Sequence, residues 1–224
     1  MNRDGEPGAV PRSESRPFPI LRRRFDVFEP RTARLKDNKA VLIRAMKRED
    51  LEGSLTFFRT LPEEDRLSLR RDLTIPEVIE ERIREMEKGA VKRLVAVADE
   101  TIVADGALEF SHLGWERHVA ELRLVVAPPY QRKGLGMLMA GALYDFAMSA
   151  GIEEIVVKMM ASQTAALRIF RKLGFRDEVV LRDYVKDIKG TRNDLVLMRS
   201  RLEDLWQKYE AFVQETDMRS FETE

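Results

Sequence analysis

Residues 126–136 read Val-Ala-Pro-Pro-Tyr-Gln-Arg-Lys-Gly-Leu-Gly, and the fold is best argued outward from this stretch. A β-branched strand is predicted before it, over residues 119–126, and an amphipathic helix after it, because apolar residues recur at helical spacing from Leu135 to Ala147. Glycines in the connection let the backbone pass close to a ligand. The first N–H groups of a helix have no intrahelical partner and carry the positive end of the helix dipole. The stretch therefore predicts an anion site, most naturally for phosphate, with Arg132 and Lys133 beside it.

Two common nucleotide-binding loops do not fit the residues at this site. The dinucleotide fingerprint needs a third glycine where Met139 stands. A P-loop needs Lys and then Ser or Thr after its second glycine, but Met137 follows Gly136. From these residues alone, two interpretations stay open: a tight strand-to-helix turn without a ligand, or a different kind of phosphate site.

A second group of residues lies further along the chain, and it gives the first group a context. Its members are Gln163, Ala166, Phe170, Gly174 and Phe175. Members of the first group are Val126, Pro128, Tyr130, Gln131, Gly134 and Gly136. In order and spacing, the two groups resemble the GNAT superfamily of N-acetyltransferases. That family has a Gln/Arg-x-x-Gly-x-Gly/Ala loop and later an Asn, an Ala, an aromatic residue and Gly-Phe.

The resemblance extends over about residues 39–200. Residues 41–44 and 47–50 look like the first strand and the helix start of the family. The opening helices, with Phe57, Phe58 and the turn at residues 61–64, look most like the acetyltransferase domain of bacterial protein lysine acetyltransferases.

Alternating strands and helices predict one α/β domain, and the resemblance implies a mixed, mostly antiparallel sheet flanked by helices. Five prolines and the basic run at residues 22–24 mark residues 1–38 as a partly disordered N-terminal tail. The acetyltransferase domain is expected over residues 39–200. An added amphipathic helix follows over residues 201–216, and residues 217–224 are expected to form a frayed tail. The apolar stripe of that helix must be buried on the domain itself or across a homodimer.

The resemblance implies acetyl-CoA as the acetyl donor. Its pyrophosphate would lie on backbone N–H groups of residues 131–136, and its pantetheine arm would pair with the backbone of residues 124–126 like an extra strand. The residues expected to bind it are Leu124, Val125, Val126, Gln131, Arg132, Lys133, Gly134, Leu135, Gly136, Gln163 and Phe170. No metal is expected, since the chain has only two histidines and no cysteine.

A carboxylate is needed to take a proton from the attacking amine, because a lysine ammonium has a pKa of about 10.4. Glu121 matches the position of the base in the protein-acetylating members, and Glu109 is the second candidate. Strand alternation places Glu121 and Arg123 on the face opposite Leu124. Either carboxylate could instead be solvated or paired with an arginine such as Arg123. A base works better where burial raises its pKa toward neutrality.

Two positions depart from the family pattern. Phe170 stands where relatives have a Tyr that is thought to protonate the leaving thiolate, and phenylalanine has no proton to donate. It could simply pack with Leu167 and Leu173. Gln163 stands where Asn is usual. Tyr184 is a conceivable replacement for the missing hydroxyl.

Composition narrows the class of protein further. The 224 residues include 39 Lys and Arg against 39 Asp and Glu, and this balance argues against a main role in binding nucleic acid. Absence of cysteine excludes an acetyl-cysteine intermediate. No apolar run is long enough to span a membrane and no signal peptide is visible, so a cytoplasmic protein is expected.

Acetyl transfer to a primary amine by direct attack is the predicted function. A protein lysine is the first acceptor and a small-molecule amine the second. A non-catalytic acyl-CoA-binding or sensing module is the alternative, which the missing Tyr favours. Charge does not identify the acceptor, because residues 47–72 hold six basic and seven acidic groups.

Overall fold

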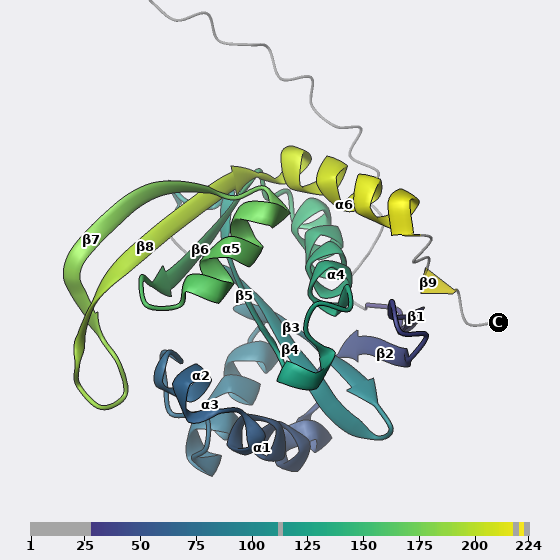
Figure 1. Ribbon diagram of the computed structural model, residues 1–224, viewed down its shortest axis with the longest axis horizontal. Coiled ribbons are helices and arrows are strands. Elements are labelled where there is room, and N and C mark those ends of the chain that lie inside the picture. The colour runs from purple at the N-terminus through teal and green to yellow at the C-terminus, as the bar shows by residue number, and fades with distance from the viewer. Residues whose placement is uncertain (1–27, 112–113, 217–219, 222–224) are drawn as a thin grey trace, which may run out of the picture.

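The computed structural model describes residues 28–111, 114–216 and 220–221. Its strands form one nine-stranded sheet in the order β7-β8-β6-β5-β4-β3-β2-β1-β9 (Figure 1). The strands are β1 Arg31–Arg34, β2 Ala40–Ala45, β3 Val91–Ala98, β4 Thr101–Phe110, β5 Val119–Val126, β6 Glu154–Met160, β7 Arg176–Lys186, β8 Arg192–Arg201 and β9 Ser220–Phe221. The α-helices are α1 Leu51–Thr60, α2 Glu63–Leu67, α3 Pro76–Glu87, α4 Leu135–Ser149, α5 Thr164–Leu173 and α6 Leu202–Thr216. The α/β fold class is as predicted.

The helices cover the two faces of the sheet in separate groups (Figure 1). Alternation along β3 divides the core, since Leu94 and Ala96 pack with α4, α5 and α6 while Val95 packs with α1 and α3. On β5 the same alternation sends Leu124 to the α4 side and Val125 to the α1 side, as the sequence predicts. The sheet therefore separates the core side chains that pack under α1 and α3 from those that pack under α4.

The pairing between two adjacent strands of the sheet is incomplete. Strands β5 and β6 are its parallel pair, and their register covers only Val119, Ala120 and Glu121 against Glu154, Ile155 and Val156. Both strands continue beyond this register, β5 to Val126 and β6 to Met160. Residues 122–126 therefore pair with β4 on one side and diverge from β6 on the other.

The sheet begins earlier than predicted. Residues 1–38 were expected to be a tail, but Arg31–Arg34 forms β1 and pairs antiparallel with β2. This prediction is wrong for the segment because Ala33 and Leu35 are buried and anchor it to the core. Residues 1–27, with the basic run at 22–24, lie outside the described residues. Of the expected tail at 217–224, the structure describes only Ser220 and Phe221, which pair with β1 as β9.

The C-terminal helix packs on the domain itself. Leu202 and Leu205 of α6 are buried, and Trp206, Tyr209 and Phe212 pack against the core beside them. Helices α4 and α6 approach closely, because a Cβ atom added at Gly141 would lie 2.2 Å from the Tyr209 ring. The apolar stripe is therefore covered within the chain and does not require a dimer.

Candidate active site

The glycine loop ends at the first turn of α4. Gly134 adopts a φ of 92°, which is left-handed and favours glycine, and it directly precedes the helix. Its carbonyl accepts hydrogen bonds from the N–H groups of Met137 (3.0 Å) and Leu138 (3.1 Å). The N–H groups of Leu135 and Gly136 precede these donors and have no acceptor within the helix. Together with the helix dipole, this arrangement suits an anion such as phosphate.

Two of the residues expected to bind the donor have side chains that hold the loop in place. The Gln131 amide donates to the carbonyl of Val126 at 2.9 Å, so it ties the loop to the end of β5. Lys133 forms an ion pair with Asp37 at 2.7 Å, and its carbonyl accepts a hydrogen bond from the N–H group of Lys36. Arg132 is exposed with a φ of 59°. The anion site thus depends mainly on backbone groups.

A cavity of about 140 Å³ lies at the divergence of β5 and β6. Its walls include Leu122, Leu124 and Val125 from β5, Val157, Lys158 and Met159 from β6, Ala166 and Phe170 from α5, and Gln163 directly before α5. The second predicted group therefore lines the cavity through Gln163, Ala166 and Phe170, together with β5 residues that precede the first group. The Gln163 side chain accepts a hydrogen bond from the N–H group of Met160 at 2.9 Å and so fixes the turn from β6 into α5.

Phe170 packs in the core and also lines the cavity. Its side chain is buried in the core, where the ring meets that of Phe175 edge to face at 5.4 Å between centroids. It also lines the cavity, opposite the β5 residues. Tyr184, the suggested replacement for a hydroxyl here, is 66% exposed on β7 and is not among the residues that line the cavity.

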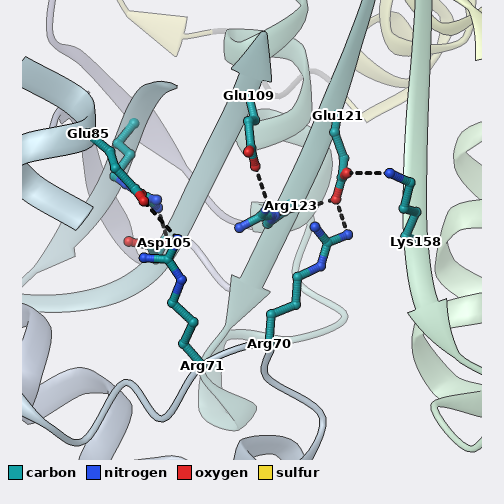
Figure 2. Close-up of polar contacts among 9 residues, drawn as sticks. Arg70, Arg71, Glu85, Asp105, Glu109, Glu121, Arg123 and Lys158 are labelled. Carbon is teal, nitrogen blue, oxygen red and sulfur yellow. Dashed lines mark hydrogen bonds and ion pairs between the residues drawn. The ribbon is translucent and has the colours of Figure 1, made fainter. Parts of the chain in front are cut away.

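Glu121 is the last residue of β5 that pairs with β6, and its side chain is only 11% exposed. Arg70 donates to one carboxylate oxygen, Arg123 approaches that oxygen at 3.4 Å, and Lys158 lies 3.1 Å from the other (Figure 2). Burial by itself raises the pKa of Glu121, but the charges of these three partners outweigh it and lower the pKa. This corrects the expectation that burial would bring a base here toward neutrality. Glu121 is ionised at neutral pH.

Glu109 is less enclosed. It is the cross-strand neighbour of Glu121 and its side chain is 43% exposed. Arg123 donates to it and thereby bridges the two carboxylates (Figure 2). Glu109 is more exposed to water than Glu121. Of the three cations that contact Glu121, only Arg123 also contacts Glu109.

Sequence reasoning missed how basic the cavity wall is. Its charged lining comprises Arg70, Arg71, Arg82, Arg93, Arg123 and Lys158 against Glu85 and Asp105. These cations come from the segment after α2, from α3 and from strands β3, β5 and β6. A count of charges over residues 47–72 could not find them, because the fold selects which side chains of each segment face inward.

The described residues contain no group of three or more His, Cys, Asp or Glu side chains that could hold a metal ion. His112 lies outside the described residues. Among the residues described, no helix has both the length and the apolar character needed to cross a membrane.

Comparison with known proteins gives this arrangement a family. A curated relative from Salmonella typhimurium, named [ribosomal protein bS18]-alanine N-acetyltransferase, is 26% identical over 117 residues, which cover 52% of this chain and 71% of the relative. The protein of the same name from Escherichia coli is 32% identical over 75 residues, and that match spans only half of its length and 34% of this chain.

Solved structures agree on the fold. Mycobacterium smegmatis RimJ in complex with CoA-disulfide aligns with a TM-score of 0.71 at 16% identity, covering 87% of this chain and 98% of that one. The structure of yncA from Salmonella typhimurium with its cofactor acetyl-CoA aligns with a TM-score of 0.61 at 18% identity, covering 72% and 94%. The profile of the acetyltransferase (GNAT) family matches residues 55–175, more than half of the chain, so the protein belongs to this family and is an acetyl-CoA-dependent N-acetyltransferase.

Proposed function

We propose that the chain transfers the acetyl group of acetyl-CoA to the α-amine at the N-terminus of a polypeptide, by direct attack with Glu121 as general base. The observation that carries the proposal is the place of Glu121. It is a buried, ionised carboxylate where β5 and β6 separate, beside the cavity wall. Leu124 and Val125 of β5 and Phe170 of α5 line that cavity, and we propose that the thioester lies between them, beside Glu121.

The donor would be held largely by backbone. N–H groups at the start of α4 would bind the pyrophosphate, and the free side of residues 122–126 would pair with the pantetheine arm. The side chains of Leu124 and Phe170 would enclose the arm from β5 and α5. A backbone N–H group near Val126 would stabilise the negative oxygen that forms as the amine attacks.

The electrostatics of Glu121 favour an α-amine over the lysine side chain first expected from the sequence. A base with a lowered pKa is a weaker base, so it suits an acceptor that loses its proton easily. An α-ammonium has a pKa of about 7.7–8.0, against about 10.4 for lysine. The cations around Glu121 lower the ammonium pKa further, since like charges repel. The names of the curated relatives also point to an N-terminal α-amine.

Departure of the thiolate has no Tyr hydroxyl to assist it at position 170. Arg123 and Lys158 line the cavity and carry positive charge there, so they would stabilise the developing negative charge electrostatically. The proton of the amine passes to Glu121, and the thiolate takes its proton from water.

Two matched peptides test the acceptor. One has a free N-terminal alanine and no lysine, and the other has a blocked N-terminus and a single lysine. We expect mass spectrometry to find the acetyl group on the alanine peptide. Modification of the blocked peptide alone would establish a lysine acceptor instead. Acetyl-CoA binding without turnover on either peptide or on a panel of small amines would favour the non-catalytic alternative.

A further inference from the structure

A buried charged cluster lies in the cavity wall, where its Asp105 is the cross-strand neighbour of Val125. Arg82 of α3, Arg93 of β3 and Asp105 of β4 are each at most 6% exposed. Arg82 donates to Oδ1 of Asp105 at 2.8 Å, and Arg93 approaches the same oxygen at 3.6 Å. We call these three residues the Arg82 cluster. Two guanidinium groups thus share a single carboxylate oxygen.

The Arg82 cluster is short of partners. Nη1 of Arg82, Nε of Arg93 and Oδ2 of Asp105 are buried and have no hydrogen-bond partner among the described residues. Burial, followed by repulsion from Arg82, lowers the pKa of Arg93 to about 10. Buried polar groups in folded proteins are nearly always paired, and an unpaired one calls for an explanation such as a ligand.

The Arg82 cluster contributes to the surplus positive charge of the cavity wall. The ion pairs around the wall join six cations to five carboxylates, which are Glu81, Glu85, Asp105, Glu109 and Glu121. Arg71 has Glu81 and Glu85, and Arg123 has Glu109 and Glu121. Arg70 and Lys158 share Glu121, but their side chains are 41% and 37% exposed. Arg82 and Arg93 share Asp105 and are buried, so water cannot stabilise their charges. One negative charge from outside would balance the wall.

The donor's phosphates are poorly placed to supply that charge. Strand alternation puts Arg93, Asp105 and Arg123 on the face covered by α1 and α3, whereas the N-terminus of α4 belongs to the other face (Figure 1). Arg82 also packs over the Phe58 ring of α1 at 4.8 Å, which fixes its guanidinium on the α1 side. If the donor lies in the gap between β5 and β6, the acceptor enters from the side of the sheet that α1 and α3 cover.

Building on the proposed function, we infer that the acceptor polypeptide carries an acidic side chain shortly after its N-terminal amine, and that Arg82, supported by Arg93, binds it. Register sets the spacing. Asp105 lies four residues from Glu109, the cross-strand neighbour of Glu121, so the cluster and the base are about 14 Å apart at about 3.4 Å per residue. An extended peptide with its amine at Glu121 would bring an acidic side chain at its second to fourth residue toward the cluster. The α-carboxylate of a free amino acid would not reach.

The test compares two peptides that differ only in charge, Ala-Glu-Glu and Ala-Gln-Gln at their N-termini with the same neutral remainder. We expect kcat/KM for the acidic peptide to be about tenfold higher or more, mostly through KM, because a hydrogen bond between ionised groups is stronger than a neutral one. Free alanine should be a poor acceptor. Arg82→Met removes the surplus charge while keeping the stem over Phe58, so it should abolish the preference for the acidic peptide. Arg82→Lys should restore part of it.

Arg84→Gln is the matched control, since Arg84 lies on the same helix, 54% exposed and paired only with Glu80 among the described residues. If Arg82 had only a structural role, Arg82→Met would lower the stability of the protein without changing the ratio of kcat/KM between the two peptides. Equal kcat/KM for both peptides with wild-type enzyme, a ratio unchanged in a folded Arg82→Met variant, or free alanine as the better acceptor would each overturn the inference. Failure to acetylate any polypeptide would instead reject the proposed function.

Discussion

Replacing Glu121 by glutamine tests the chemistry most directly. The amide keeps the size of the carboxylate but cannot accept the proton, so kcat should fall by about 10²–10⁴-fold if Glu121 is the general base. Acetyl-CoA affinity should change little, because the donor is proposed to be held by α4 and by the backbone of residues 122–126. Rates measured at saturating acetyl-CoA, together with calorimetric titration of the donor, separate the two effects.

The same substitution has a cost in stability that can be estimated. It leaves Arg70, Arg123 and Lys158 without their shared carboxylate, but each of these side chains is at least 35% exposed and can turn to water. We therefore expect a loss of about 1–2 kcal/mol, below the 3–5 kcal/mol typical of breaking a fully buried pair. Because the pKa of Glu121 is lowered on folding, its stabilisation is full above its ordinary pKa and is lost as the pH falls through the folded-state value. The difference in stability between wild type and variant should shrink in acid.

Glu109→Gln is the matched control, since Glu109 binds the same Arg123 and is the neighbouring carboxylate. It should retain most of the activity. A Glu121→Gln enzyme with near-normal kcat alongside an inactive Glu109→Gln enzyme would refute the reasoning and transfer the role to Glu109.

Three further substitutions test other parts of the structure. Phe170→Tyr adds a hydroxyl at the cavity wall and should leave turnover unchanged or higher in steady-state assays; a large fall in melting temperature without a kinetic gain would show that the ring only packs. Gly136→Asp should weaken acetyl-CoA binding in calorimetry through charge repulsion, while Gly136→Ala should not, because its Cβ would meet Leu124 at an ordinary 3.8 Å. Gly141→Ala should lower the free energy of unfolding by about 1–3 kcal/mol in urea titrations through its clash with the Tyr209 ring. Adding Tyr209→Leu should recover part of this loss, and no recovery would place the strain elsewhere.

Local patterns were enough to predict many elements of the fold. Strand β5 has the predicted bounds and helix α4 covers the predicted stretch from Leu135 to Ala147, because alternation and helical spacing depend on neighbours in sequence. Strand β1 could not be predicted in this way. It lies in a segment rich in proline and arginine and becomes a strand through pairing with β2 and β9. Its buried Ala33 is too small to give a hydrophobic signal.

The site residues divide in the same way, into those that sequence patterns locate and those that only the folded chain brings together. The glycine loop and Phe170 could be located from motif spacing, and the structure places the loop directly before α4 and Phe170 in the cavity wall. The partners of Glu121 could not be located, because Arg70 precedes it by 51 residues and Lys158 lies on another strand. Their charges decide whether Glu121 is a strong or a weak base. The acceptor therefore depends on contacts that exist only in the folded chain.

The incomplete pairing between β5 and β6 links binding of the donor to the stability of the enzyme. Only three positions join these strands, so the proposed pantetheine arm would serve as the missing edge of residues 122–126. A ligand that binds only the folded state stabilises it by RT ln(1 + [L]/Kd), about 2.7 kcal/mol at a hundredfold excess over Kd. Amide protons along β5 and β6 should then exchange more slowly as the acetyl-CoA concentration rises. The supply of donor would govern how long each molecule resists unfolding as well as how fast it works.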